Sequence, residues 1–241
     1  MSNAPAVLLE AGLVVDGSGG PSWPGDVLLQ GDRILALGDG LRARLPAGLN
    51  IADVDVVDCC GKVIAPGFID AHTHDDAIVL RDPLCLPKVS QGITTVVTGN
   101  CGISLAPYRT PQSKPPLTLL GADSFKHATM AEYRAAVDAT QPALNVAALV
   151  GHTTLRFAAM QALDRPADGD ELARMETLLD DCMAAGAHGL SSGLFYEEAF
   201  AAPAEEVTAL ARVVARHGGV YATHLRSEMQ QIIEALHEAG D

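Results

Sequence analysis

Short apolar runs separated by turn-forming residues occupy the first sixty residues. The runs "AVLLEAGLVV", "DVLLQGDRILALGDG" and "VDVVDC" each have the length and composition of strands. Asp16-Gly17 and Gly31-Asp32 are typical of tight turns between strands. The pattern therefore predicts a small β module over residues 1–63.

The pattern changes after residue 63, where apolar segments alternate with stretches of helical periodicity. The apolar segments are "VIAPGFIDA", "GITTVVTG", "LNVAALVG", "AHGLSSGL" and "GGVYATH", and a final helix is predicted in "SEMQQIIEALHEAG". Thr129 and Glu132 have the spacing of a capping box, and Gly186 and Gly218 stand where helices end. Strands that alternate with helices in this way predict βαβ units and a parallel α/β sheet.

The predicted strand count bears on the architecture. A closed (β/α)8 barrel of the TIM type has eight strands, whereas the pattern supplies five, the last ending near His224. We therefore expect residues 64–241 to be an incomplete barrel. An open parallel edge is poorly stabilised, so we also expect the native polypeptide to be longer by at least three βα units, and residues 1–241 alone to be poorly stable.

Composition narrows the possible partners. The formal charge is −14, from 16 basic and 30 acidic residues, which disfavours nucleic acids and anionic membranes. Neither a signal peptide nor a long uninterrupted apolar segment is visible, and the five cysteines match no disulfide framework. These features predict a cytoplasmic globular protein with neither a nucleic-acid nor a membrane partner, and they leave the oligomeric state open.

Candidate metal ligands stand at the ends of three predicted strands. His72 and His74 follow the first strand in "GFIDAHTHDD", and side chains two residues apart on a strand share a face, so both imidazoles can reach one ion. Cys101 follows the second strand between two glycines, and His224 ends the fifth. Each residue alone could be an ordinary polar or core residue. Their shared position at the carboxyl ends of strands, where α/β folds place their sites, favours one metal site.

Other polar residues near these strand ends could have either a functional or a purely structural role. Asp70 and Asp75 could orient the imidazoles. His152, Ser191, Ser192 and Tyr196 could contact a substrate or serve only the fold. Arg226 could bind a substrate carboxylate or pair with Glu228. We assign no role to the histidines at positions 127, 188, 217 and 237.

These strand-end motifs resemble a known family. "GKVIAPGFIDAHTHDD" is similar to the first strand of the amidohydrolase superfamily, which many members precede with part of a small β-sandwich. "VVTGNCGIS", "VGHTTLR", "GLSSGLFYEEAFAAP" and "YATHLRSE" together resemble the N-acyl-D-amino-acid deacylases, or D-aminoacylases. The likeness runs from about residue 6 to the end, although "EEAF" departs from a proline-containing stretch common in relatives.

The resemblance implies a fold, a metal and a reaction. Residues 1–63 would be the N-terminal part of a β-sandwich, and residues 64–241 part of a metal-dependent hydrolase barrel. One or two zinc ions would be held by His72, His74, Cys101 and His224, although iron, cobalt or nickel can occupy such sites. The substrate would be a small N-acyl-D-amino acid, contacted by Tyr196, Arg226 and His152, and its amide bond would be hydrolysed. The catalytic acid/base is expected beyond residue 241.

Two alternatives remain at this point. Another amidohydrolase, such as a cyclic amidase or deacetylase, would share the histidine pair, and an inert fragment would share the fold. Hydantoinases and dihydroorotases typically use a carboxylated lysine near the fourth strand end. The lysines of this chain are at positions 62, 88, 114 and 126, away from that strand end, so a cysteine ligand is the better fit.

Overall fold

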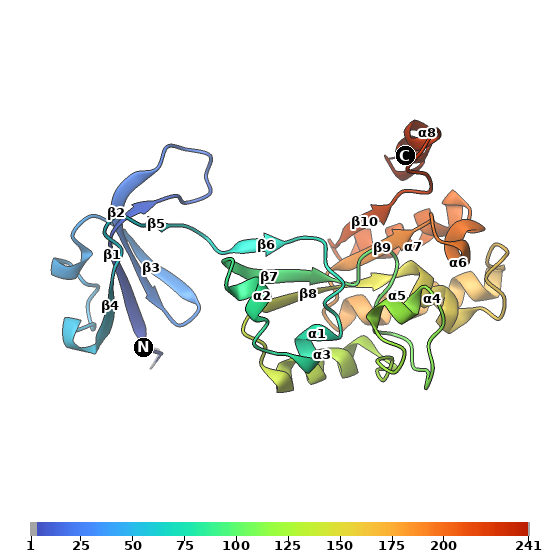
Figure 1. Cartoon of the computed structure of the whole chain (residues 1–241), viewed down its shortest axis with the longest axis horizontal. Helices are drawn as coiled ribbons and strands as arrows, with labels where there is room; N and C mark the ends of the chain where they lie inside the picture. The colour runs from blue at the N-terminus through green and yellow to red at the C-terminus, as the bar shows by residue number, and fades with distance from the viewer. Residues whose placement is uncertain (1–3, 241) are drawn as a thin grey trace. The chain divides into compact units, whose positions relative to one another are not determined.

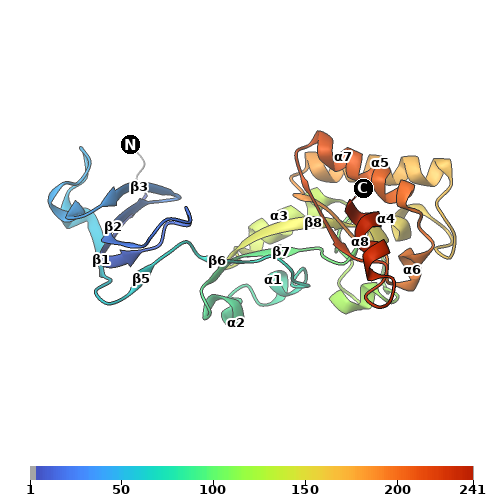
Figure 2. The same ribbon diagram turned by 90° about the horizontal axis from the view of Figure 1, so that it is seen from above.

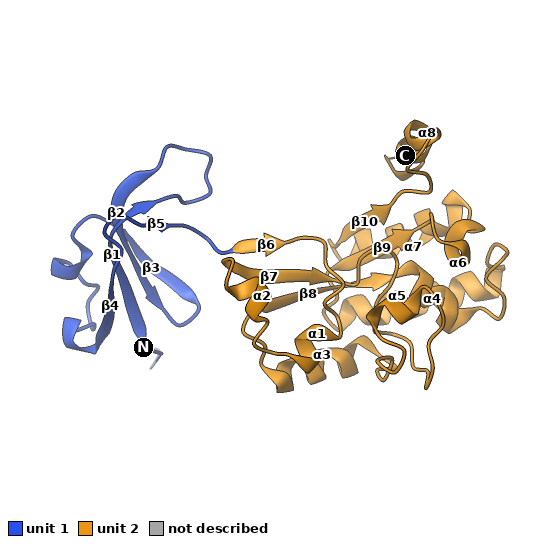
Figure 3. Cartoon of the chain, viewed as in Figure 1, with its two compact units in different colours: residues 1–67 blue, residues 68–241 orange. Residues whose placement is uncertain are grey.

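The computed structural model describes residues 4–240 and divides the chain into two compact units, Met1–Gly67 and Phe68–Asp241 (Figure 3). Each unit has its own sheet. Within residues 4–240, no helix has both the length and the apolar character needed to cross a membrane.

The first unit is built on one five-stranded mixed sheet. Its strands are β1 (Ala6–Val14), β2 (Trp23–Gln30), β3 (Arg33–Gly38), β4 (Val54–Asp58) and β5 (Val63–Ile64), and two short 3₁₀ helices, Leu41–Ala43 and Ile51–Asp53, precede β4. β1, β2 and β3 pair antiparallel, whereas β4 and β5 run parallel to β1. The Gly31-Asp32 turn joins β2 to β3 as predicted, while Asp16-Gly17 lies in a longer loop. Because residues 4–67 contain one sheet, a β-sandwich is not confirmed.

The second unit contains five parallel strands in chain order. They are β6 (Phe68–Asp70), β7 (Ile93–Thr98), β8 (Asn145–Gly151), β9 (Gly189–Gly193) and β10 (Val220–His224). Each strand pairs with the next, and all five lie within the segments that the apolar pattern marked (Figure 1). The predicted parallel α/β arrangement is confirmed, and the carboxyl ends of the strands share one edge of the sheet.

Helices connect the strands of this sheet (Figure 2). They are α1 (Ile78–Arg81), α2 (Leu86–Val89), α3 (Met130–Thr140), α4 (His152–Ala159), α5 (Gly169–Ala184), α6 (Glu197–Phe200), α7 (Ala204–Arg216) and α8 (Ile232–Gly240), with a 3₁₀ helix at Leu117–Leu120. Thr129 caps α3, but the Glu132 carboxylate accepts from Ala128 N at 2.7 Å, so the predicted capping box is only half formed. α8 begins five residues later than the sequence pattern suggested.

The main core lies between the sheet and its long helices. Val96, Val150 and Leu190 from consecutive strands are fully buried, and so are Met175 and Leu179 from α5. Side chains at the sheet edges are open instead: Phe68 on β6 is 66 % exposed and Val220 on β10 is 58 % exposed. The apolar packing thus fixes β7, β8 and β9 most firmly, and these strands support the loops at the carboxyl edge.

Candidate metal centre

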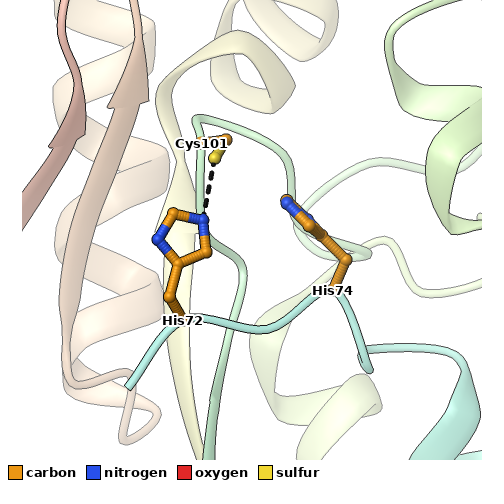
Figure 4. Close-up of side chains that lie close together, drawn as sticks. All are labelled: His72, His74 and Cys101. Carbon is orange, nitrogen blue, oxygen red and sulfur yellow. Dashed lines mark hydrogen bonds between the residues drawn. The ribbon is translucent and has the colours of Figure 1, made fainter. Parts of the chain in front are cut away.

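His72 and His74 lie directly beyond β6, which ends at Asp70, rather than on the strand itself. Thr73 between them donates its backbone N–H to Val97 O at 3.1 Å, which keeps the segment alongside β7. This backbone bond turns both imidazoles toward the loop that carries Cys101 (Figure 4). Both imidazoles therefore lie on the same side of the chain, as expected, although the strand ends before them.

Cys101 stands in a tight loop after β7. Gly99, Cys101 and Gly102 have φ values of 76°, 55° and 75°, which are left-handed conformations. A Cβ atom at Gly99 would lie 2.1 Å from Leu149 O, so only glycine fits there. The Asn100 side-chain amide donates to Val97 O at 2.9 Å and ties the loop to its own strand. This backbone carries the buried Cys101 sulfur to the two imidazoles.

The ligand atoms of His72, His74 and Cys101 all lie within 4.8 Å of one another. His72 Nε2 is 3.1 Å from Cys101 Sγ, whereas tetrahedral zinc places neighbouring N and S ligands ~3.5 Å apart. His74 Nδ1 is buried and has no hydrogen-bond partner within residues 4–240, as expected of a nitrogen that coordinates a metal ion. Two imidazoles and a sulfur are a donor set that suits Zn²⁺, so these residues fit a metal ion.

His224 lies at the margin of this group. Its Nδ1 is 3.8 Å from Cys101 Sγ and 3.5 Å from the Tyr196 hydroxyl. Its Nε2 is 2.6 Å from Glu228 Oε1, although the two atoms are not aligned for a hydrogen bond. The Phe195 ring packs on the imidazole, with 5.4 Å between centroids. The carboxyl end of β10, which carries His224, thus reaches the site. Phe195 and Glu228 also contact His224, and no sequence motif identified them.

Burial shifts the pKa of two of the candidate ligands, His74 and Cys101. Burial lowers the pKa of His74, and the neighbouring His72 lowers it further. Burial raises the pKa of the Cys101 thiol, an effect that a hydrogen bond with Tyr196 opposes. A neutral imidazole is the form that coordinates a cation, and a bound cation in turn favours the thiolate.

Asp70 and Asp75 do not orient the imidazoles. Their carboxylates hold Lys88 Nζ at 2.6 and 3.1 Å. The hydrogen bond from Lys88 lowers the pKa of Asp70. The next acid, Asp76, is 1 % exposed and accepts from Gly99 N at 3.1 Å, and burial raises its pKa to about 7. The acidic run therefore supports the backbone around the site.

Two predicted substrate contacts are engaged elsewhere. His152 is fully buried, with Nε2 2.9 Å from Glu206 Oε1. Arg226 forks onto Glu238 at 2.6 to 3.1 Å and donates to Phe200 O at 2.6 Å, so its partner is neither Glu228 nor an open carboxylate site. A direct role for either residue in substrate binding stays a prediction, whereas Tyr196 stands beside Cys101 and His224.

The chain is similar to known amidohydrolases. Residues 55–240 match the model of the amidohydrolase family. The chain is 47 % identical to N-acyl-D-aspartate deacylase and 46 % identical to D-aminoacylase of Alcaligenes xylosoxydans xylosoxydans, alignments that cover 99 % and 96 % of this chain but 47 % and 46 % of those proteins. The chain thus spans about half the length of the curated relatives it matches.

Solved structures show the same relationship. A crystal structure of a D-aminoacylase, described as defining a novel subset of amidohydrolases, aligns with a TM-score of 0.89 at 46 % identity, covering 96 % of this chain and 48 % of that one. N-acyl-D-glutamate deacylase from Bordetella bronchiseptica, complexed with zinc and a phosphonate inhibitor, aligns with a TM-score of 0.87 at 39 % identity, covering 97 % and 48 %. The curled parallel sheet of residues 68–240 matches the sheets of these structures.

Proposed function

The chain belongs to the amidohydrolase family, and we propose that it hydrolyses the amide bond of N-acyl-D-amino acids with a zinc ion. The observation that carries the proposal is the convergence of two imidazoles and a cysteine sulfur within 4.8 Å at the carboxyl edge of the sheet. The similarity to an N-acyl-D-aspartate deacylase, an N-acyl-D-glutamate deacylase and a D-aminoacylase supports the substrate class.

The proposal assigns a task to each residue of the site. His72, His74 and Cys101 would hold the ion, and His224 would complete its ligands or help to hold a second ion. Zinc in such a site supplies Lewis acidity, which polarises a carbonyl group and makes water a better nucleophile. The reaction adds a water oxygen to the acyl carbon and breaks the C–N bond, and both protons of the water pass to the departing nitrogen, giving a carboxylate and a D-amino acid with a protonated amino group.

Tyr196 presents a hydroxyl group beside Cys101 and His224. Burial raises the pKa of its phenol, and the nearby Cys101 raises it further, so the hydroxyl keeps its proton at neutral pH. We assign it the donation of a hydrogen bond to the substrate carbonyl oxygen. Its neighbours, the Cys101 sulfur and His224 Nδ1, would keep that donor beside the ion.

The proposal extends to the architecture. The five strands would be part of a (β/α)8 barrel, residues 64–241 its hydrolase domain and residues 1–63 part of a β-sandwich. The matches to complete D-aminoacylase structures over 96 % and 97 % of this chain support this assignment. The carboxyl edge of the barrel is the edge that carries the metal ligands, as in other enzymes of this fold.

The test is a substrate panel with the zinc-loaded full-length enzyme. N-acetyl-D-aspartate, N-acetyl-D-glutamate and N-acetyl-D-leucine are each compared with the L-enantiomer, and release of the free amino group is measured. We expect hydrolysis of D-substrates only, loss of activity with a chelator and its return with zinc. Equal hydrolysis of both enantiomers, or turnover that survives metal removal, would refute the proposal.

A further inference from the structure

The hydroxyl of Ser191 joins two backbone groups on either side of Cys101. Ser191 lies on β9 and is fully buried. Its Oγ accepts from Gly102 N at 2.9 Å and donates to Gly99 O in a short hydrogen bond. One hydroxyl thus links Gly99, on one side of Cys101, to Gly102 on the other.

The loop needs such a bridge because its backbone cannot satisfy these groups itself. Gly99 and Gly102 are left-handed, and so is Cys101, where this conformation costs a residue with a side chain ~1–2 kcal/mol. The carbonyl of Gly99 and the N–H of Gly102 face Ser191 inside the protein, away from solvent. A buried backbone group without a partner is destabilising, so the loop would relax if the hydroxyl were absent.

We propose that Ser191 is a positioning residue of the metal centre, whose hydroxyl holds the Cys101 loop so that the sulfur stays within reach of the two imidazoles. The inference rests on the proposed metal site but concerns a residue outside the proposed ligand set, whose hydroxyl is engaged by Gly99 and Gly102. Cys101 Sγ lies 3.1 Å from His72 Nε2, and a shift of the loop by even 1 Å would disturb this arrangement. Partners that orient a ligand typically change metal affinity by ~10- to 100-fold.

Ser192 provides a matched control on the same strand. It too is fully buried, but consecutive strand residues face opposite ways, and its hydroxyl lies 2.7 Å from both Tyr221 OH and Thr223 Oγ1. Ser192→Ala therefore removes a buried hydroxyl with two partners, as Ser191→Ala does, but leaves the Cys101 loop untouched. A loss confined to Ser191→Ala is a loss of loop positioning and not of general packing.

The experiment measures metal affinity and the thiolate signature in the full chain. Zinc affinity is determined by competition with a chromophoric chelator, and cobalt(II) replaces zinc to record the thiolate-to-metal absorption band. We expect Ser191→Ala to weaken zinc binding ~10- to 100-fold and to shift or weaken the cobalt band. Ser192→Ala should stay within ~3-fold of the wild type, because its hydroxyl bonds the side chains of Tyr221 and Thr223, which are neither ligands nor part of the Cys101 loop.

Ser191→Thr keeps the hydroxyl while it crowds a buried position, so it should lose stability but retain zinc affinity and the cobalt band. This variant decides the question if Ser191→Ala does not fold, and a tenfold loss of affinity in the threonine variant would overturn the proposal. So would equal zinc affinity in the two alanine variants. A full-length enzyme that binds zinc but hydrolyses no N-acyl-D-amino acid would refute the proposed function and leave the Ser191 result standing. A wild-type chain that binds no zinc would overturn both.

Discussion

Gly61 in the first unit and Gly99 in the second both have left-handed backbones, but the loop around Gly61 is open and the loop around Gly99 is tightly packed. Gly61 has φ 71° in the turn between β4 and β5, where an added Cβ would meet nothing within 4 Å. A hydrogen bond within the turn, from Lys62 N to Cys59 O at 2.9 Å, stabilises it. Gly99 has φ 76°, but an added Cβ would lie 2.1 Å from Leu149 O. The first turn needs only its own residues, whereas the second depends on strands and side chains far away in the sequence.

The difference shows how the metal centre is built. In the loop of residues 99–102, Gly99 O accepts from the Ser191 hydroxyl and Gly102 N donates to it. The Gly99 N–H donates to Asp76, and Gly102 O accepts from Thr154 N at 3.2 Å. Each partner comes from a different part of the second unit. Such a loop holds one conformation only while the surrounding structure is intact, which is the condition for a fixed ligand geometry.

Replacement of the two glycines gives the largest contrast. Gly99→Ala forces a Cβ into the backbone of β8 in an unfavourable conformation, so we expect a loss of more than ~4 kcal/mol in the free energy of unfolding. Gly61→Ala should cost ~1 kcal/mol, for the conformation alone. Urea unfolding of both variants measures the difference, and similar losses would show that the loop at residue 99 is as self-contained as the turn at residue 61.

Removal of the cysteine sulfur separates metal binding from packing. Cys101→Ala should reduce zinc affinity by more than ~100-fold, which is ~2.8 kcal/mol, because an anionic ligand is lost. Cys182→Ala is the control: that thiol is buried on α5, and burial raises its pKa to about 12. It should cost stability without changing zinc affinity. Chelator competition on both variants checks this, and unchanged affinity in Cys101→Ala would remove Cys101 from the centre.

The buried carboxylate of Glu206 in the second unit should make the free energy of unfolding depend on pH. Burial raises the pKa of Glu206, but hydrogen bonds from His152 and Ala167 N and the charge of Arg156 outweigh burial and lower it to about 2. Burial also lowers the pKa of His152. Both groups bind protons more readily when unfolded, so their contribution is present above their unfolded pKa values and is lost as pH falls through the folded ones.

The expected acid sensitivity comes in two steps. The contribution of His152 should begin to fall below pH ~6.5 as the unfolded histidine protonates, and that of Glu206 should fall from pH ~4.5 toward 2, by roughly 2 kcal/mol. Asp76, whose folded pKa is raised to about 7, contributes in the opposite sense as pH falls below 7. Urea unfolding at a series of pH values measures this. Glu206→Gln should flatten the lower step, and an unchanged profile in that variant would assign the acid sensitivity to other groups.

The smallest effect is expected at a surface ion pair of the first unit. Arg42 Nη1 lies 3.1 Å from Glu10 Oε2, with the arginine side chain 56 % exposed. Arg42→Ala should cost no more than ~0.5 kcal/mol, and less at high salt, because water screens the pair. Urea unfolding at low and high salt tests this, and a loss above ~2 kcal/mol would show that the first unit also depends on buried long-range contacts.

The parts of the structure that could be predicted are those encoded in neighbouring residues. The five parallel strands, the helix ends at Gly186 and Gly218 and the histidine pair after β6 all follow from local patterns. The contacts of Ser191 with residues 99 and 102 and the fork of Arg226 onto Glu238 could not be predicted. Each joins residues whose types are common and whose proximity exists only in the folded sheet.

The central claim, one ion held by a sulfur and imidazole nitrogens, is tested most directly by zinc X-ray absorption spectroscopy of the loaded chain. The structure predicts one sulfur neighbour at ~2.3 Å and nitrogen or oxygen neighbours at ~2.0–2.1 Å, with the sulfur shell absent in Cys101→Ala. A zinc shell of nitrogen and oxygen alone in the wild type would contradict the account.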